Sequence, residues 1–378
     1  MLLTLVLAST LLQAPQPRQG SIESDLVEAI DRNYLYAEMD PWKQLRTRLL
    51  KSTQATVATL DRQLLSLHDG DLRVVTSEQM KTMQDETAGH ESGIGLVDFA
   101  ITVEPATGEA RVVTALVDSP AFQSGLLPGD VIVAVDGKPT RGLIHEEIMS
   151  LLRGDGGTSW LIIRRNDRQF KMAVPKRLWD EPDVVFRHIE GEQNLGYLAI
   201  HLFTPDAGNK VREAVAALAA DGVEGCIVDL RSNPGGYLDA MAVAGSAFTN
   251  EVLGWKVRRD GTREPIQSSF PVLKRMRLAI LVNEGTASAA EILAEGLREM
   301  IGARLVGADT FGRGQIQTYV ALGNAAGIII PAASVQSMKG EQFNKKSGLK
   351  PDFTVPSSVN SGARDAAYLR AVELLKHG

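Results

Sequence analysis

Ser288 stands at a position where a serine could act as a nucleophile. In the segment 282–291 (VNEGTASAAE), an apolar strand pattern ends and a helical pattern begins, with Ser288 at the join. There the neighbouring backbone N–H groups and the helix dipole could stabilise a developing oxyanion. The spacing of Ser288 and Glu291 also fits a capping box, which would serve only the helix end. Taken alone, the segment favours the cap.

Two further segments combine glycines with polar residues. In 229–236 (DLRSNPGG), a strand pattern runs into a helical one, and Gly235 and Gly236 permit a backbone with exposed N–H groups suited to an oxyanion hole. An ordinary strand–turn–helix connection is the alternative. The other segment is 306–317 (VGADTFGRGQIQ).

With these three segments in this order, the chain resembles the C-terminal processing peptidases, which are tail-specific serine proteases. Their pattern includes a DLR-N-GG turn, a serine in an ASA-E setting and a TFGKG…Q segment, and 348–352 (GLKPD) also matches. The resemblance covers roughly residues 21–356. It implies that Ser288 is the nucleophile, that the oxyanion amides come from Gly235, Gly236 and Ala289, and that Gln317 positions the general base.

Arg313 occupies the position of the family's lysine base, and the flanking TFG and glycine leave no other register. A lysine must lose about 3 pKa units to act as a base near neutral pH, which costs roughly 4 kcal/mol. For arginine the cost would be roughly 8 kcal/mol or more, and proteins do not normally deprotonate it. Arg313 could instead hydrogen-bond Ser288 or stabilise negative charge.

His201 is a candidate for a substitute base. The alternative is that His201 is a structural histidine at the end of a strand.

A second module is indicated upstream. Residues 119–130 (SPAFQSGLLPGD) resemble the SPA…GL..GD segment of PDZ domains, and a strand pattern follows over 131–135. The preceding Gly93, Ile94, Gly95 and Leu96 look like the PDZ carboxylate-binding loop. Glycines let successive N–H groups point at one anion, so the resemblance implies binding of polypeptides with apolar C-termini as an added strand.

The elements that must position these residues divide the chain into four ranges. We expect a signal peptide or anchor over 1–20, a helical N-terminal domain over 21–90 closed by the acidic turn 68–71, a PDZ-like domain over 91–176 and a serine-peptidase α/β domain over 177–378. Strand patterns at 112–117, 131–135, 160–163 and 170–174 describe the β-rich module, and β-α alternation from residue 194 predicts a layered α/β domain. The resemblance implies an α/β fold of the crotonase and ClpP kind, with the PDZ-like module as an insert.

The amino-acid composition argues against nucleic-acid binding and against cysteine-based sites. The chain has 378 residues and a net charge of -6, so it carries no basic footprint for nucleic acid. Its single cysteine excludes an internal disulfide and a cysteine-based metal site, and no metal or nucleotide motif predicts a cofactor. The uncharged apolar run 1–14 predicts export to the periplasm or another extracytoplasmic compartment. Membrane attachment through the N-terminus and the oligomeric state stay open.

Three functions remain. The leading hypothesis is a serine endopeptidase that cleaves exported proteins after PDZ recognition of an apolar C-terminal tail. The alternative is a catalytically weak or inactive homologue that binds peptides, because Arg313 replaces the lysine. The third, binding of a small apolar ligand, rests on a resemblance to the retinoid-binding repeats of a photoreceptor matrix protein. The PDZ-like insert and Ser288 count against it.

Overall fold

The computed structural model describes residues 21–52, 55–69, 71–87, 91–97, 100–104, 107–154, 156–179, 182–323, 326–343, 348–355 and 365–377. The signal peptide or anchor expected over 1–20 lies outside these residues. Among the helices so described, none is long and apolar enough to cross a membrane.

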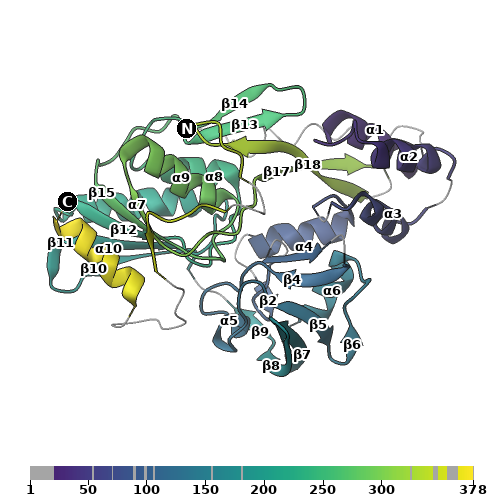
Figure 1. Ribbon diagram of the computed structural model, residues 1–378, viewed down its shortest axis with the longest axis horizontal. Helices are drawn as coiled ribbons and strands as arrows, with labels where there is room; N and C mark the ends of the chain where they lie inside the picture. Colours follow the sequence, from purple (N-terminus) through teal and green to yellow (C-terminus); the bar gives the residue numbers. More distant parts are fainter. Residues whose placement is uncertain are drawn as a thin grey trace, which may run out of the picture.

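A six-stranded sheet forms the centre of the α/β domain (Figure 1). In order across the sheet, its strands are β10 (Val184–Ile189), β11 (Glu192–Ile200), β12 (Gly225–Asp229), β15 (Arg277–Val282), β16 (Arg304–Gly307) and β19 (Phe353–Thr354). β10 is antiparallel to β11, and every later pair is parallel. This arrangement confirms the predicted layered α/β fold.

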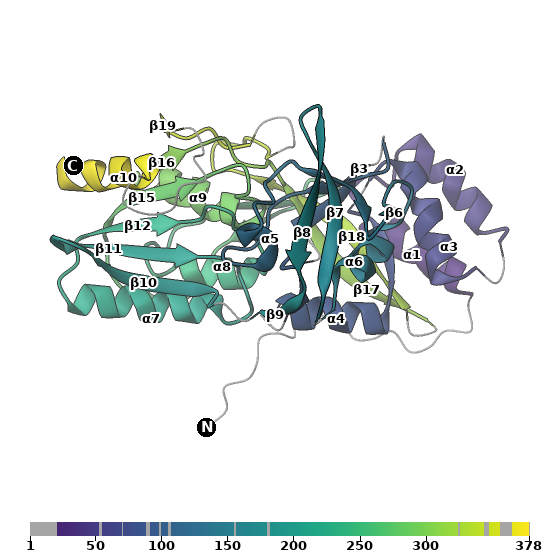
Figure 2. The same cartoon turned by 90° about the horizontal axis from the view of Figure 1, so that it is seen from below.

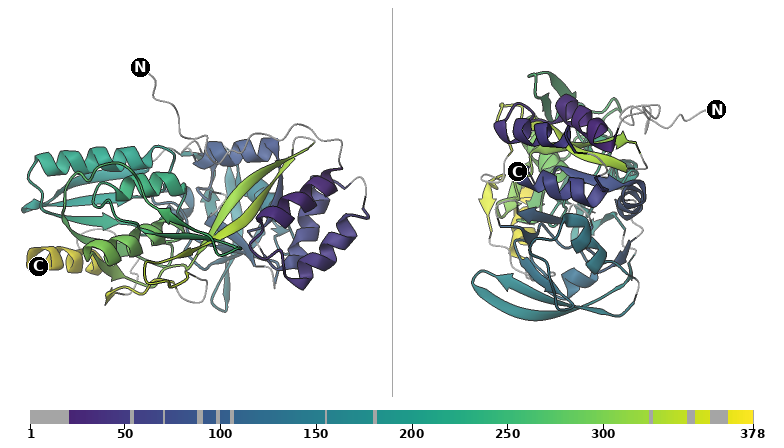
Figure 3. Two further views of the ribbon diagram at one scale, coloured as in Figure 1. Left: turned by 90° about the horizontal axis from the view of Figure 1, so that it is seen from above. Right: turned by 90° about the vertical axis from the view of Figure 1, so that its right-hand side faces the viewer.

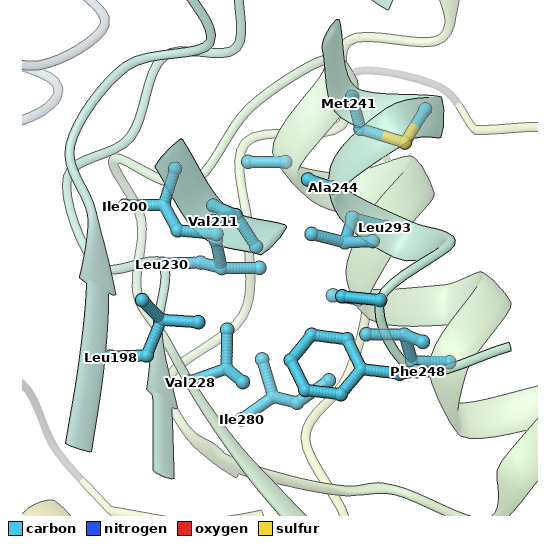
Figure 4. Close-up of a cluster of buried hydrophobic side chains, with 14 of the residues drawn as sticks. Leu198, Ile200, Val211, Val228, Leu230, Met241, Ala244, Phe248, Ile280 and Leu293 are labelled. Carbon is cyan, nitrogen blue, oxygen red and sulfur yellow. The ribbon is translucent and has the colours of Figure 1, made fainter. Parts of the chain in front are cut away.

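Helices cover both faces of this sheet (Figure 2). One face carries α7 (Ala207–Ala220), α8 (Leu238–Gly245) and α9 (Ala289–Ile301), and the other carries α10 (Ala366–His377). Because successive strand side chains point to opposite faces, Val228 and Ile280 pack with the first group of helices, whereas Ile227 and Leu281 pack with α10. Figure 4 shows the first cluster, where the Phe248 ring lies beside Ile280.

The β-rich module is a separate sheet. Its strands follow the order β3 (Ile101–Glu104), β4 (Glu109–Val112), β5 (Val131–Val135), β7 (Thr158–Arg165) and β8 (Arg168–Pro175), with β6 (Lys138–Pro139) on β5. Helices α5 (Pro120–Gln123) and α6 (His145–Leu152) pack with it, and β2 (Glu91–Gly93) pairs with β9 (Arg177–Trp179). The strand expected over 112–117 is wrong beyond Val112. The N–H groups of Val113 and Leu116 bond instead to the carbonyls of Ala100 and Gly95, neither of which lies in a strand.

The N-terminal region is helical, as predicted. It contains α1 (Ile22–Asn33), α2 (Asp40–Leu49), α3 (Val57–Leu64), the 3-10 turn η1 (Leu65–Leu67), β1 (Arg73–Thr76) and α4 (Ser77–Thr87). Ser21 and Thr56 cap α1 and α3 by accepting backbone N–H groups. The buried leucines of these helices share their core with Ile328 and Ile330, which lie far along the chain.

Those two isoleucines belong to a long hairpin that joins the α/β domain to the N-terminal helices (Figure 3). It consists of β17 (Gln315–Leu322) and β18 (Ala326–Gln336), and β18 also pairs with β1 and with β13 (Gly254–Arg258), which pairs with β14 (Arg263–Ile266). The helices therefore rest on an antiparallel sheet whose strands come from both ends of the chain.

Candidate active site

The three segments singled out in the sequence meet at one edge of the α/β sheet. They follow the carboxyl ends of β12, β15 and β16, which are neighbouring parallel strands. Ligand and catalytic sites of open α/β sheets form at this edge. The loops also bond directly to one another, because Ala287 N–H donates to the Asn233 carbonyl at 2.9 Å and Phe311 N–H donates to the Thr286 carbonyl at 3.0 Å.

Ser288 is the N-cap residue of α9 and has a strained backbone. Its φ of 54° and ψ of -121° lie in a region that side chains rarely adopt, and such strain clusters at functional sites. The hydroxyl makes no cap hydrogen bond. Instead the Glu291 N–H donates to the Ser288 carbonyl at 2.9 Å, while the Glu291 carboxylate accepts the Ser288 N–H at 2.9 Å. The capping interpretation thus explains Glu291 and leaves the serine hydroxyl available for chemistry.

The two glycines are required by close contacts. A Cβ on Gly235 would stand 2.8 Å from the Ser288 Cβ, and a Cβ on Gly236 would stand 2.3 Å from the Phe203 carbonyl oxygen. The Gly235 N–H donates to Asn233 Oδ1 at 2.8 Å. Within the described residues, the N–H groups of Gly236 and Ala289 have no acceptor. Of the three amides expected to bind an oxyanion, these two remain as donors.

Glu291 connects the serine to the TFGRG segment. Its buried carboxylate accepts hydrogen bonds from the Thr310 hydroxyl and from the N–H groups of Gly312 and Arg313, both at 2.8 Å, in addition to Ser288. Burial raises the pKa of Glu291, and the donated hydrogen bonds oppose that rise. Sequence reasoning missed this role because it treated Glu291 as a helix cap.

Arg313 is buried beside an acidic partner from the N-terminal region. Its side chain is 8% exposed, and Nη2 lies 3.8 Å from Oδ1 of Asp71. The guanidinium carbon lies 5.6 Å from the centroid of the Phe311 ring. Sequence reasoning also missed Asp71, which it placed only in the turn that closes the helical region. The ion pair joins the N-terminal region to the TFGRG segment.

The remaining candidate residues are placed differently. Gln317 lies in β17, with an exposed side chain, directly after a register shift in the pairing with β18. The His201 ring bonds through Nδ1 to the Pro182 carbonyl at 3.1 Å, and within the described residues no hydrogen bond joins it to Ser288. Among those residues no cluster of three His, Cys, Asp or Glu side chains could hold a metal ion.

Residues 93–96, which the sequence predicts to bind a carboxylate, direct their apolar side chains into the β-rich module. Ile94 and Leu96 are buried in the core of the module. Gly95 has a φ of 82°, and a Cβ there would stand 2.1 Å from the Ser119 Cβ. The turn 93–96 is therefore built around glycine, as a nest for an anion requires.

The β-rich module also contacts the loop that leads from β15 to Ser288. Thr114 is fully buried, and a Cβ on Gly285 would stand 2.6 Å from the Thr114 hydroxyl. Gly285 lies three residues before Ser288 in the chain. The β-rich module and the site are thus in direct contact at this loop.

Comparison with known proteins agrees with this arrangement. The model of peptidase family S41 matches residues 194–355, and a PDZ domain model matches residues 111–165. A carboxyl-terminal-processing protease of Synechocystis is 31% identical over 342 residues, covering 88% of this chain and 79% of the relative. The protein of that name from Picosynechococcus is 30% identical over 338 residues, covering 87% and 81%. A solved photosystem II D1 C-terminal processing protease matches with a TM-score of 0.78 at 25% identity, covering 94% of this chain and 96% of that one.

Proposed function

The chain belongs to peptidase family S41, and we propose that it is a slow serine endopeptidase. In this proposal it cleaves exported polypeptides after its PDZ domain binds their apolar C-terminal tail. The observation that carries the proposal is Ser288 itself. Its backbone is strained and its hydroxyl is not used as a cap, although a helix N-cap needs no strain and uses the hydroxyl. The family relationship supports protease activity, and the apolar run 1–14 supports the export part of the proposal.

The geometry suggests how acyl transfer would proceed. The Ser288 oxygen attacks the scissile carbonyl carbon, and the displaced electron pair forms an oxyanion that the N–H groups of Gly236 and Ala289 can stabilise. The intermediate collapses by breaking the C–N bond, and the departing amine takes up the proton that the serine loses. Water then attacks the acyl-enzyme, which releases the new carboxyl terminus and restores the serine hydroxyl.

The weak point of this mechanism is the proton on the Ser288 hydroxyl. Arginine stays protonated in proteins, so Arg313 can stabilise negative charge but cannot accept this proton. General-base assistance is typically worth about 10²–10⁴-fold, and we expect turnover to be lower by a factor of this size. The ion pair between Arg313 and Asp71 is also the observation that favours the second candidate function, a peptide-binding homologue with little or no cleavage.

A cleavage assay separates the two functions. The full chain is incubated with an unfolded polypeptide that ends in an apolar tail, and products are followed by mass spectrometry beside Ser288→Ala. Slow cleavage that disappears in Ser288→Ala supports the peptidase. Tail binding with no cleavage above the Ser288→Ala background supports the binding role instead.

A further inference from the structure

We infer that Asp71 of the N-terminal region is a positioning residue of the active site, which holds residue 313 as a fixed cation. The inference rests on the proposed role of Ser288 as nucleophile, because it concerns the group that would take the serine proton. Asp71 and Arg313 form a single unit in this view. A substitution at position 313 alone would then leave the Asp71 carboxylate in place beside the new side chain.

Asp71 is held firmly enough to act in this way. Its N–H donates to Asp69 Oδ1 at 3.1 Å, and the Tyr34 hydroxyl donates to Asp69 Oδ2 at 3.0 Å. Strand β1 begins at Arg73 and pairs with β18. Asp71 thus lies two residues before a strand of the sheet that β17 joins directly after the TFGRG segment.

The pair is also poorly screened by solvent. The two side chains are 10% and 8% exposed, with 3.8 Å between the carboxylate oxygen of Asp71 and Nη2 of Arg313. Charges that are largely removed from water interact more strongly than surface charges and are less sensitive to salt. The Asp71 carboxylate therefore attracts the cation at position 313 with little screening by water or salt.

Two further groups near residue 313 also favour a cation there. The Phe311 ring lies 5.6 Å from the guanidinium carbon, and an aromatic face attracts a cation. On the α9 side, the Glu291 carboxylate accepts the Arg313 N–H. A lysine in this setting would be held charged, whereas a catalytic lysine needs its pKa lowered.

A double-mutant cycle tests this inference. The rate of cleavage of the unfolded, apolar-tailed polypeptide is measured against pH for the wild type, Asp71→Asn, Arg313→Lys and the double variant. Asp71→Asn should not raise the rate, since arginine stays charged. Arg313→Lys should raise it modestly, and the double variant most. A carboxylate within about 4–6 Å shifts a pKa by about 1–3 units. The pH midpoint of the double variant should therefore lie about 1–3 pH units below that of Arg313→Lys, with about a tenfold to thousandfold higher rate below both midpoints.

Asp69→Asn combined with Arg313→Lys is the matched control, because Asp69 lies in the same turn and pairs with Tyr34. If the Asp71 carboxylate itself carries the effect, the midpoint of this control should stay closer to the Arg313→Lys value than the midpoint of the double variant does. A merely structural role for Asp71 would lower activity at every pH without moving the midpoint, and that result would overturn the inference. Asp71→Ser serves the same purpose if the asparagine variant does not fold.

A measurement without catalysis keeps this inference separate from the proposed function. The ammonium group of the lysine at position 313 is titrated by NMR in Ser288→Ala/Arg313→Lys, with and without Asp71→Asn. A lower pKa without the Asp71 carboxylate supports the inference even if none of the four proteins cleaves, in which case the proposed function fails. Equal pKa values overturn the inference, whatever the activities.

Discussion

A single oxygen of Glu291, Oε2, accepts the backbone N–H of Ser288 at 2.9 Å and that of Arg313 at 2.8 Å. The proposed nucleophile and the residue in the base position are therefore held in register by one buried carboxylate, through their backbones. The other oxygen, Oε1, binds Thr310 and Gly312. The bond from residue 313 to Glu291 is made by the backbone N–H and not by the side chain.

Removing this carboxylate should damage both stability and the site. Glu291→Ala leaves four donors without their acceptor, and an unsatisfied buried donor costs about 1–3 kcal/mol. Allowing for relaxation, we expect the free energy of unfolding to fall by about 3–5 kcal/mol in urea titrations. Glu295→Ala is the control, because Glu295 is buried in the same helix and pairs with Arg298 rather than with the site. A loss below about 1 kcal/mol for Glu291→Ala would show that these hydrogen bonds are not needed.

Gly235→Ala should inactivate the site by displacing Ser288. The new Cβ would stand 2.8 Å from the Ser288 Cβ, at a φ of 109°. We expect cleavage to slow by about 10²-fold, because a misplacement of about 1 Å at a reacting group can cost that much. Gly261→Ala is the matched control, since Gly261 also has a positive φ, 84°, but has no atom within 4 Å of its added Cβ. The glycine argument fails if both variants retain wild-type rates.

The PDZ domain should bind the free C-terminal carboxylate of a peptide. A peptide with apolar C-terminal residues is titrated against its amidated form, because a glycine-built loop of the PDZ kind would bind an anion through backbone N–H groups. Hydrogen bonds to a charged group contribute about 1.5–3 kcal/mol, so the acid should bind about tenfold to a hundredfold more tightly. Equal dissociation constants would mean that the loop does not recognise tails in this way.

Stability should depend on pH through Asp61. Burial raises the pKa of this carboxyl to about 6, although Val74 N–H donates to it at 2.8 Å and Arg73 lies nearby. Because the folded pKa exceeds the unfolded value of about 3.9, the contribution of Asp61 to stability is complete below about pH 4 and is lost as pH rises through about 6. The difference of about 2 units corresponds to about 3 kcal/mol.

Asp61→Asn removes this titration and keeps an acceptor for Val74. The difference in unfolding free energy between wild type and variant should therefore change by about 3 kcal/mol between pH 4 and pH 7, in favour of the variant at higher pH. Urea titrations at four pH values measure it. A pH-independent difference would contradict the raised pKa.

Much of the site could be predicted because its residues lie in short local motifs. Ser288, Gly235 and Gly236 follow strand patterns that are clear in the sequence, and neighbouring parallel strands bring their ends together. Asp71 could not be found this way. It reaches Arg313 only because β1 pairs with β18, and no local pattern predicts a pairing between such distant segments.

The antiparallel sheet escaped prediction for a related reason. Strand β18 is buried at almost every position from Ala326 to Ala333, so it lacks the alternation of apolar and polar residues that marks a strand with one exposed face. For residues 113–117 the sequence predicted a strand that the structure does not contain. This segment is apolar because it packs inside the PDZ domain, where it runs as a loop against residues 93–96.

The central claim, that Ser288 is a competent nucleophile, is tested most directly by labelling with a serine-directed fluorophosphonate. The folded full chain is treated at several pH values, and the adduct is located by peptide mass spectrometry. We predict one slow adduct on Ser288 in the wild type, faster labelling in Arg313→Lys and none in Ser288→Ala. An unlabelled Ser288 in folded wild type and folded Arg313→Lys, or an adduct that persists in Ser288→Ala, would contradict the claim.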